Sequence, residues 1–413
     1  MNESLKICLL SYRSNPHCGG QGVYVKHLSK ALTALGHQVE VVTGPPGPAL
    51  DNGIPVHKLS GLDLYNPDDL FRTPSLKELS NPVNLIEWLG VSTMGFPEPF
   101  TFGIRAFRFL QDKFNAFDLV HDNQSLSYGI QKISSHIPTI ATIHHPMTVD
   151  RDLAVKSAPS WWKKLKQKRW YSFIGMQKRV SRKLSRIITV SEASSRDLSK
   201  AYHIPLHRFR IVPNGIDTRM FYPIENIERK KYRVVVTNSA DTPLKGLRYL
   251  LLAVERISKK RPVELVVIGS PRKNGDIRKL IGKLGIGRHV TFTGRIPHEE
   301  LVMHYARAAV AVIPSLYEGF GLPAGEAMAC GIPVISTTGG ALPEVLGNAG
   351  LLVPPADASA LTDAIHRVFD NPQLAYDLGQ SGYRRVQAHF TWKRAAEKTV
   401  DAYREAIRDH RRF

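Results

Sequence analysis

The apolar residues of the first forty positions change period twice, which predicts a strand, a helix and a second strand. Residues 6–12 form a compact apolar run, as expected for a buried strand. Apolar side chains then recur every three to four residues over 25–35 and stop before Gly36, a residue suited to a helix C-terminus. Another apolar run over 39–42 predicts the next strand. This order is typical of an α/β fold with a parallel sheet.

The alternation continues along the chain with two interruptions. Residues 60–105 contain prolines and aromatic residues that look exposed, and they predict a long irregular insertion. A second break lies near 213–217, where polar residues follow. We therefore predict two Rossmann-like, doubly wound domains over 1–212 and 217–391, with a final helix over about 392–413 that packs back on the first domain. Further strands are expected at 118–121, 139–144, 186–190, 233–237, 264–269, 290–293, 310–313, 333–336 and 351–353.

The charge balance adds an expected class of partner. The chain has 413 residues, of which 43% are hydrophobic, and this is an ordinary globular composition. Lys and Arg number 56 against 36 Asp and Glu, so the formal net charge is +20. Such an excess favours an anionic partner, which is a nucleic acid, an acidic membrane surface or a phosphorylated small molecule.

Half of that net charge lies in one segment, residues 160–186, which has no acidic residue. A basic helix with aromatic anchors suits the surface of an anionic bilayer. The alternative is a helix of the first domain whose cations face water and whose aromatics pack inside. Nucleic acid is the least favoured partner, because no recognition motif accompanies the charge. The cations are Lys163, Lys164, Lys166, Lys168, Arg169, Lys178, Arg179, Arg182, Lys183 and Arg186, and the aromatics are Trp161, Trp162, Trp170, Tyr171 and Phe173.

Cysteine usage and apolar runs indicate the compartment. Cys8, Cys18 and Cys330 are too few and too scattered for a disulfide framework, and none has a partner at zinc-ligand spacing. We found no apolar run long enough for a signal-peptide core or a membrane span. We therefore expect a cytoplasmic protein, with any membrane contact peripheral and at the inner face.

The stretch 314–333 carries the most informative chemistry. A predicted strand ends, a loop with two glycines follows, and a helix is expected from about Pro323. Glycines allow backbone N–H groups to approach a ligand, and a helix N-terminus favours an anion. Glu318 in the loop and Glu326 in the first helical turn are placed to accept hydrogen bonds from sugar hydroxyls. The alternative for Glu326 is favourable first-turn electrostatics, and for Glu318 a solvated loop acid.

This stretch resembles the E-x7-E motif of family-4 glycosyltransferases, because seven residues separate Glu318 from Glu326. The family consists of retaining enzymes of GT-B architecture, which implies two Rossmann-like domains facing across an inter-domain cleft. The resemblance covers most of the chain. Its other pieces are the Gly19-Gly20 loop, Thr142-Ile143-His144, Val190-Ser191-Glu192, the stretch 212–217, Lys245-Gly246, Phe292-Thr293-Gly294-Arg295, and Gly339-Gly340 with Glu344.

The resemblance implies two catalytic residues. Glu318 would bind donor-sugar hydroxyls near the reacting centre. His144 would lie near the sugar and the acceptor, since it ends a strand of the first domain and matches the family's T-x-H pattern. His145 is the competing choice.

The resemblance also implies the donor-binding residues. Glu326 would bind the nucleotide ribose, and Lys245 would neutralise the diphosphate. The Gly19-Gly20 loop lies at the switch point of the first domain, although a tight turn alone would also explain it. The backbone amides of Phe320, Gly321 and Leu322 would meet the diphosphate or the sugar.

One departure from the family pattern affects the diphosphate. The family usually pairs its lysine with an arginine five or six residues earlier, where this chain has Ala240 and Ser239. Arg248, Arg272 or Lys273 would have to compensate.

The resemblance implies a retaining hexosyltransferase that moves a sugar from a UDP- or GDP-linked donor to an acceptor hydroxyl, with a lipid-linked or envelope glycan as the expected acceptor. No cofactor is expected. No D-x-D metal motif is present, so we expect the reaction to be independent of metal. The alternatives are another GT-B enzyme, such as a nucleotide-sugar epimerase or a phosphorylase, and a catalytically silent nucleotide-sugar-binding subunit. A phosphorylase would need a lysine for pyridoxal phosphate, and we identify none.

Overall fold

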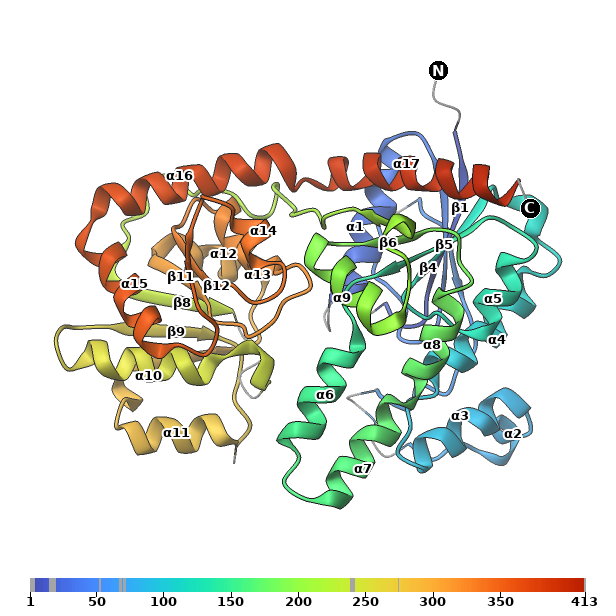
Figure 1. The fold of residues 1–413 in the computed structure, drawn as a ribbon, viewed down its shortest axis with the longest axis horizontal. Helices are drawn as coiled ribbons and strands as arrows, with labels where there is room; N and C mark the ends of the chain where they lie inside the picture. The colour runs from blue at the N-terminus through green and yellow to red at the C-terminus, as the bar shows by residue number, and fades with distance from the viewer. Residues whose placement is uncertain are drawn as a thin grey trace. The chain divides into compact units, whose positions relative to one another are not determined.

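The computed structural model describes residues 4–14, 20–51, 53–66, 69, 72–237, 242–273 and 275–411. The chain divides into two compact units, each built on a parallel sheet with helices against it (Figure 1). Unit 1 comprises Met1–Val190, Ser194–Pro213 and Trp392–Phe413, and unit 2 comprises Ser191–Ala193 and Asn214–Thr391. The two α/β series expected from the hydrophobic pattern are therefore present.

The sheet of unit 1 has seven strands in the order β3-β2-β1-β4-β5-β6-β7, and every pair is parallel. Its central strands are buried along nearly their whole length, as expected for a sheet covered on both faces. The direction of strand order reverses beside β1, and ligands of such sheets bind outside the carboxyl ends of the strands. The strands are β1 (Lys6–Ser11), β2 (Gln38–Thr43), β3 (Val56–Lys58), β4 (Leu119–Asn123), β5 (Thr139–Ile143), β6 (Ile187–Thr189) and β7 (Phe209–Ile211).

The C-terminal helix α17 (Trp392–His410) packs beside α1 (Gly20–Ala34) in unit 1 (Figure 1). Its apolar face joins the core formed by α1, β1 and β2. The remaining helices of unit 1 are α2 (Leu76–Leu79), α3 (Pro82–Ser92), α4 (Glu98–Leu110), η1 (Phe114–Ala116), α5 (Tyr128–Ser134), α6 (Met147–Ser157), α7 (Trp161–Trp170), η2 (Tyr171–Phe173), α8 (Ile174–Ser181), α9 (Glu192–Tyr202) and η3 (Leu206–Arg208).

The expectation of an irregular insertion over 60–105 was wrong for its second half, which forms α2, α3 and most of α4. Its aromatic residues were also expected to be exposed. Phe102 is buried beneath the sheet, and Phe96 stacks on Trp170 with ring centroids 5.2 Å apart. Prolines obscured the helices in the sequence, although Pro82 and Pro99 stand in first turns, where the missing N–H costs nothing.

The basic segment 160–186 is two helices, not one, because η2 interrupts it between α7 and α8. Every side chain of α7 is at least partly exposed, and the helix stands away from the sheet of its unit (Figure 1). Trp170, Tyr171 and Phe173 pack against aromatic or apolar neighbours, whereas Trp161 and Trp162 are 74% and 53% exposed. The expected packing of the aromatic residues inside the first domain therefore holds for Trp170, Tyr171 and Phe173, and not for Trp161 and Trp162.

The sheet of unit 2 has six parallel strands in the order β10-β9-β8-β11-β12-β13. Apolar residues of β8, α10 and α15 form its main core. Its strands are β8 (Lys230–Thr237), β9 (Glu264–Ile268), β10 (Val290–Gly294), β11 (Ala308–Ile313), β12 (Val334–Thr337) and β13 (Leu351–Val353); its helices are η4 (Pro243–Lys245), α10 (Leu247–Ser258), α11 (Asp276–Leu284), η5 (Gly287–His289), α12 (His298–Arg307), α13 (Leu322–Ala329), α14 (Leu342–Leu346), α15 (Ala358–Asp370) and α16 (Pro372–His389).

None of the helices among the described residues combines the length and the apolar character that crossing a membrane requires.

Candidate functional site

The loop between β11 and α13 in unit 2 holds Glu318 against a lysine from a distant part of the chain. Glu318 Oε1 accepts hydrogen bonds from Lys245 Nζ and from Ser315 Oγ, each at 2.7 Å. The Glu318 side chain is largely buried, whereas Lys245 is about one-third exposed. Two of the three charged residues expected to contact the donor, Lys245 and Glu318, therefore contact each other. Ser315, which fixes the carboxylate, was missed by the sequence analysis.

Gly246 explains why Lys245 reaches Glu318. Its φ of +65° is left-handed, and a Cβ there would lie 1.9 Å from the carbonyl oxygen of Pro314. The loop before α10 thus packs directly on the loop after β11, and Leu316 N donates to Leu244 O at 2.7 Å. A residue with a side chain at position 246 would separate the two loops.

A third loop, after β12, supports the backbone of Glu318. Gly340 forms an isolated parallel bridge with Glu318, and Ala341 N donates to Glu318 O at 2.9 Å. Gly340 has a φ of +65°, and a Cβ there would lie 2.2 Å from that same oxygen. Glu318 is therefore held by loops that follow β11 and β12, with Lys245 supplied from the loop that follows β8.

The helix expected from about Pro323 begins at Leu322, with Gly321 as its N-cap at a φ of +97°. No side chain within the described part of the chain caps this terminus, and the first N–H groups of a helix have no partner within the helix. The Phe320 ring is buried against Phe390. Phe320, Gly321 and Leu322, whose backbone amides were expected to meet the diphosphate or the sugar, therefore lie at the N-terminus of α13.

Glu326 lies in the second turn of α13 rather than in the first turn expected for it. The first-turn interpretation counted from Pro323 and placed the acid too close to the helix end. Burial raises the pKa of Glu326 to about 7. Burial, and after it the charge of Glu326, raises the pKa of Tyr305, whose hydroxyl lies 2.9 Å from Thr237 Oγ1 at the end of β8.

The departure from the family pattern at Ser239 and Ala240 lies outside the described residues. The three cations considered as compensation, Arg248, Arg272 and Lys273, are exposed in unit 2. Within the ranges that the structure describes, no group of three or more His, Cys, Asp and Glu side chains is arranged to hold a metal ion.

His144 follows β5 in unit 1 and is fixed by Asn123, the last residue of β4, and by Gln124, which follows it. His144 Nε2 donates to Asn123 Oδ1 at 2.8 Å, and its backbone N–H donates to Gln124 Oε1 at 2.9 Å. Burial lowers the pKa of His144 to about 3, so the ring is neutral with Nδ1 as its acceptor. The competing His145 is paired with Asp150 at 2.6 Å.

Asn123 and Gln124 were missed by the sequence analysis, although their position after an apolar strand was a usable signal. The buried polar residues that pack next to them, His121, Tyr24 and Thr142, were missed as well. His121 Nε2 and Tyr24 Oη lie 2.7 and 3.0 Å from Thr142 Oγ1, on the strand that leads to His144. The edge of the Tyr24 ring also contacts His144, with centroids 4.7 Å apart.

Of the Gly19-Gly20 loop, the structure describes one residue. Gly20 is the exposed first residue of α1, and Gly19 lies outside the described residues.

Sequence comparisons match both halves of the chain. Residues 18–220 match the model of Glycosyltransferase Family 4, and residues 221–385 match that of the Glycosyl transferases group 1. An MMP alpha-(1->4)-mannosyltransferase of Mycolicibacterium hassiacum is 46% identical over 408 residues, which cover 98% of each chain. A D-inositol 3-phosphate glycosyltransferase of Streptomyces bingchenggensis is 26% identical over 99% of this chain and 91% of its own.

Solved structures agree with the fold. Sucrose-phosphate synthase of Thermosynechococcus elongatus superposes with a TM-score of 0.75 and 26% identity, over 98% of this chain and all of its own. Anabaena HepE in complex with UDP-glucose has the same fold, with a TM-score of 0.68 and 16% identity over 97% of this chain and all of its own. Two parallel Rossmann-like sheets and these matches confirm the GT-B architecture. The chain belongs to glycosyltransferase family 4 and is a glycosyltransferase.

Proposed function

We propose that this enzyme is a retaining α-mannosyltransferase that transfers mannose from a nucleotide-diphosphate donor to a sugar hydroxyl, without a metal ion. The observation that carries the choice of sugar is the 46% identity, over nearly the whole of both chains, with the MMP alpha-(1->4)-mannosyltransferase. A nucleotide-linked donor is supported by HepE, which shares the fold and was solved with UDP-glucose.

The arrangement in unit 2 supports binding of the donor diphosphate. Lys245 directly precedes Gly246 and α10, and Glu318 lies in the loop that leads to the uncapped N-terminus of α13. A cation and a helix N-terminus both stabilise negative charge on phosphate oxygens. Lys245 would turn from Glu318 to the diphosphate, which would leave the Glu318 carboxylate free for the sugar hydroxyls. Glu326 would take the ribose.

In the reaction that we propose, the bond between the anomeric carbon and the diphosphate oxygen breaks while the acceptor oxygen bonds to the same face. The acceptor proton passes to a phosphate oxygen of the leaving group. The enzyme stabilises the departing negative charge with Lys245 and the backbone of α13, in positions fixed before the reaction. Neutral His144 would offer Nδ1 to a sugar hydroxyl.

A donor panel tests this function. GDP-mannose, GDP-glucose, UDP-glucose and UDP-N-acetylglucosamine are screened by thermal shift, and each hit is then assayed for consumption with a mannoside acceptor. We expect GDP-mannose to be consumed and the product to be the α-anomer by NMR. A β-linked product would overturn retention, and a donor that binds without transfer or hydrolysis would favour the silent-subunit alternative. Unchanged transfer by Glu318→Ala would overturn the site.

Metal independence has its own test. Activity should be retained in full after EDTA treatment, because Lys245 and the α13 backbone would supply the positive potential. Activity lost with EDTA and restored by Mg²⁺ would overturn this part of the proposal.

We also propose that α7 docks on an anionic lipid surface. The helix carries five cations and no acid, and Trp161, Trp162 and Leu165 project from it. Tryptophan side chains favour the interface between headgroups and acyl chains, and cations favour anionic headgroups. This arrangement supports peripheral contact of the enzyme with a membrane that holds the acceptor.

Co-sedimentation with vesicles tests the membrane contact. We expect binding to phosphatidylcholine vesicles that contain phosphatidylserine, and its loss when Trp161 and Trp162 are both replaced by Ala. Tyr376→Ala is the matched control, since Tyr376 is an aromatic residue of similar exposure on α16 in unit 2. Absence of binding at physiological salt would remove the proposal.

A further inference from the structure

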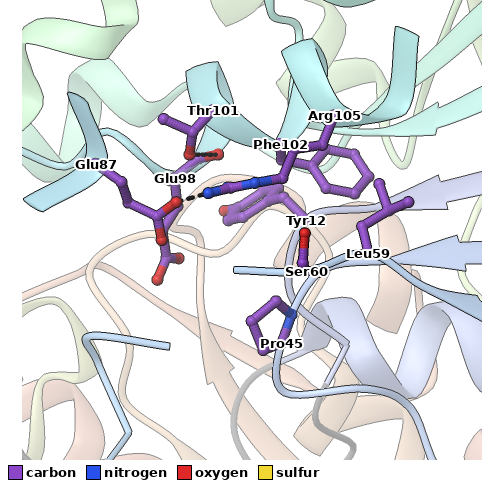
Figure 2. Close-up of a pocket in the computed structure, with 10 residues that line it drawn as sticks. Tyr12, Pro45, Leu59, Ser60, Glu87, Glu98, Thr101, Phe102 and Arg105 are labelled. Atoms are coloured by element: carbon purple, nitrogen blue, oxygen red, sulfur yellow. Dashed lines mark hydrogen bonds and ion pairs between the residues drawn. The ribbon is translucent and has the colours of Figure 1, made fainter. Parts of the chain in front are cut away.

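A small polar cavity lies in unit 1 beside the carboxyl ends of β1, β2 and β3 (Figure 2). It has a volume of about 20 Å³, which is room for one or two water molecules. Its walls come from the residues that follow these three strands and from α3 and α4. The lining residues are Tyr12, Gly44, Pro45, Leu59, Ser60, Glu87, Glu98, Thr101, Phe102 and Arg105.

Two buried carboxylates face this cavity, and each is paired with one arginine. Glu87 Oε2 lies 2.6 Å from Arg105 Nη1, and Glu98 Oε1 accepts from Arg13 Nη2 at 2.7 Å. Figure 2 shows Glu87 and Glu98 on one side of the pocket, across from Ser60 and Pro45. Glu98 is only 8% exposed, and its second oxygen, Oε2, has no hydrogen-bond partner among the residues that the structure describes. A buried carboxylate oxygen without a partner is costly, and it marks a position for a hydrogen-bond donor.

The walls of the cavity are stiff. Arg13 lies over the rings of Tyr65 and Phe96, at 5.2 and 5.8 Å from their centroids, which holds its guanidinium against Glu98. Gly44 N donates to Ser11 O at 3.1 Å, and a Cβ on Gly44 would lie 2.5 Å from the carbonyl oxygen of Tyr12. The position that the cavity offers to a ligand is therefore defined before the ligand arrives.

A chain of hydrogen bonds joins this wall to His144 along the same edge of the sheet. Ser11 Oγ donates to Arg13 O at 3.1 Å, and Asn123 Nδ2 donates to Ser11 Oγ at 3.4 Å. Asn123 Oδ1 in turn accepts from His144 Nε2. Because β1, β4 and β5 are neighbours in the sheet, the cavity and His144 both lie at the carboxyl edge of unit 1.

The chemistry of the cavity selects a neutral hydroxyl. The free Glu98 oxygen accepts a hydrogen bond from an O–H group, whereas a carboxylate or a fully ionised phosphate has only acceptor oxygens to offer. Burial raises the pKa of Glu98 to about 7, so the carboxyl accepts a hydrogen bond when ionised and also donates one when protonated. The volume admits a hydroxyl group and excludes a whole sugar ring, which would lie at the mouth, over the exposed Ser60.

We propose that this cavity is an acceptor subsite, in which Glu98 binds a hydroxyl group of a neutral acceptor glycan. The proposal rests on the proposed function, which requires an acceptor sugar, and it identifies residues that would bind that sugar. Glu98 acts here as a binding residue, since its carboxyl would contact the acceptor without taking part in bond making.

Two measurements on the same variants test the subsite. Binding of 4-nitrophenyl α-D-mannopyranoside is followed by saturation-transfer NMR, and binding of GDP by calorimetry. Glu98→Gln and Ser60→Leu should each raise the mannoside Kd about tenfold or more, because one removes the acceptor atom and the other fills the mouth. The Kd for GDP should stay within about twofold of the wild-type value. Asp409→Asn, which breaks an ion pair of unit 1 with Arg186 outside this cavity, is the control and should change neither.

The outcomes separate this proposal from the proposed function. A mannoside Kd that is the same in wild type and in both variants would overturn the subsite, as would a wild-type enzyme that does not bind the mannoside. If Glu98→Gln lowers the melting temperature, the mannoside Kd of Ser60→Leu tests the subsite instead, because this substitution changes an exposed position and should not destabilise the fold. Loss of mannoside binding in the variants, with no nucleotide sugar consumed by the wild type, would support the subsite and overturn the transfer reaction.

Discussion

Lys245 Nζ lies 2.7 Å from Glu318 Oε1, and this contact joins residues from loops that follow two different strands. The carboxylate is nearly buried and the ammonium is partly exposed, so the pair is stronger than an ion pair on an open surface. Each member is expected to bind a different part of the donor. The contact therefore keeps both charges partnered until a diphosphate competes for the lysine.

Replacement of Lys245 tests that competition. Lys245→Met keeps the length of the side chain but removes its charge, and we expect kcat/KM for the donor to fall by about 10²–10³-fold. Lys245→Arg should restore part of this loss, because it keeps the positive charge. Steady-state kinetics with varied donor provide the measurement. Lys279→Met, at an exposed position of α11 in the same unit, is the matched control, and if it lowered activity equally, the charge of unit 2 as a whole would be responsible.

The raised pKa of Glu326 predicts a pH dependence of stability. Its pKa is about 7 in the folded chain against 4.5 for the ordinary group, so the folded state binds the proton more tightly. This contribution is fully present below about pH 4.5 and is lost as the pH rises through about 7. The wild type should therefore lose stability as the pH rises from about 4.5 to above 7, whereas Glu326→Gln lacks this loss. The free energy of unfolding of the variant minus that of the wild type should increase over this range. Urea unfolding at several pH values measures the difference, and parallel curves would contradict the buried-carboxyl explanation.

The backbone at Gly340 supports Glu318, so a methyl group there should damage the site. Gly340→Ala combines a left-handed φ with a Cβ 2.2 Å from Glu318 O, and we expect a loss of about 2–3 kcal/mol of stability and at least about tenfold in activity. Gly282→Ala is the control, since this glycine lies within helix α11 of the same unit with nothing within 4 Å of the added carbon. That variant should be neutral or slightly more stable. Equal melting temperatures for the two variants would rule out the steric argument.

His144 should remain neutral at the pH of the assay. Burial holds its pKa at about 3, well below the ordinary 6.5, so folding favours the unprotonated ring. Its contribution to stability is present above about pH 6.5 and is lost as the pH falls toward 3. In NMR spectra, the imidazole signal that disappears in His144→Asn should not shift between about pH 8 and pH 5. A midpoint near 6.5 would show that the ring is solvated and ionisable.

Local sequence patterns predicted much of the fold because each pattern is repeated within one element. The apolar run of β1 and the helical spacing in α1 needed no information from elsewhere in the chain. The same kind of information failed over 76–110, where first-turn prolines and aromatics concealed three helices. One of those aromatics, Phe96, packs against Tyr65 and Trp170, which lie outside these helices.

The sequence by itself determined the α/β order, the family and the acidic pair Glu318 and Glu326, because these depend on spacing along one stretch of chain. Only the tertiary structure decided that Lys245 contacts Glu318 across 73 positions, and that Arg13 holds Glu98 across 85. Sheet order and glycine-dependent loop packing bring such residues together. Neither of them produces a repeating pattern of residues along the sequence from which the contact could be predicted. Burial, which raises the pKa of Glu98 and lowers that of His144, is likewise a property of the folded chain.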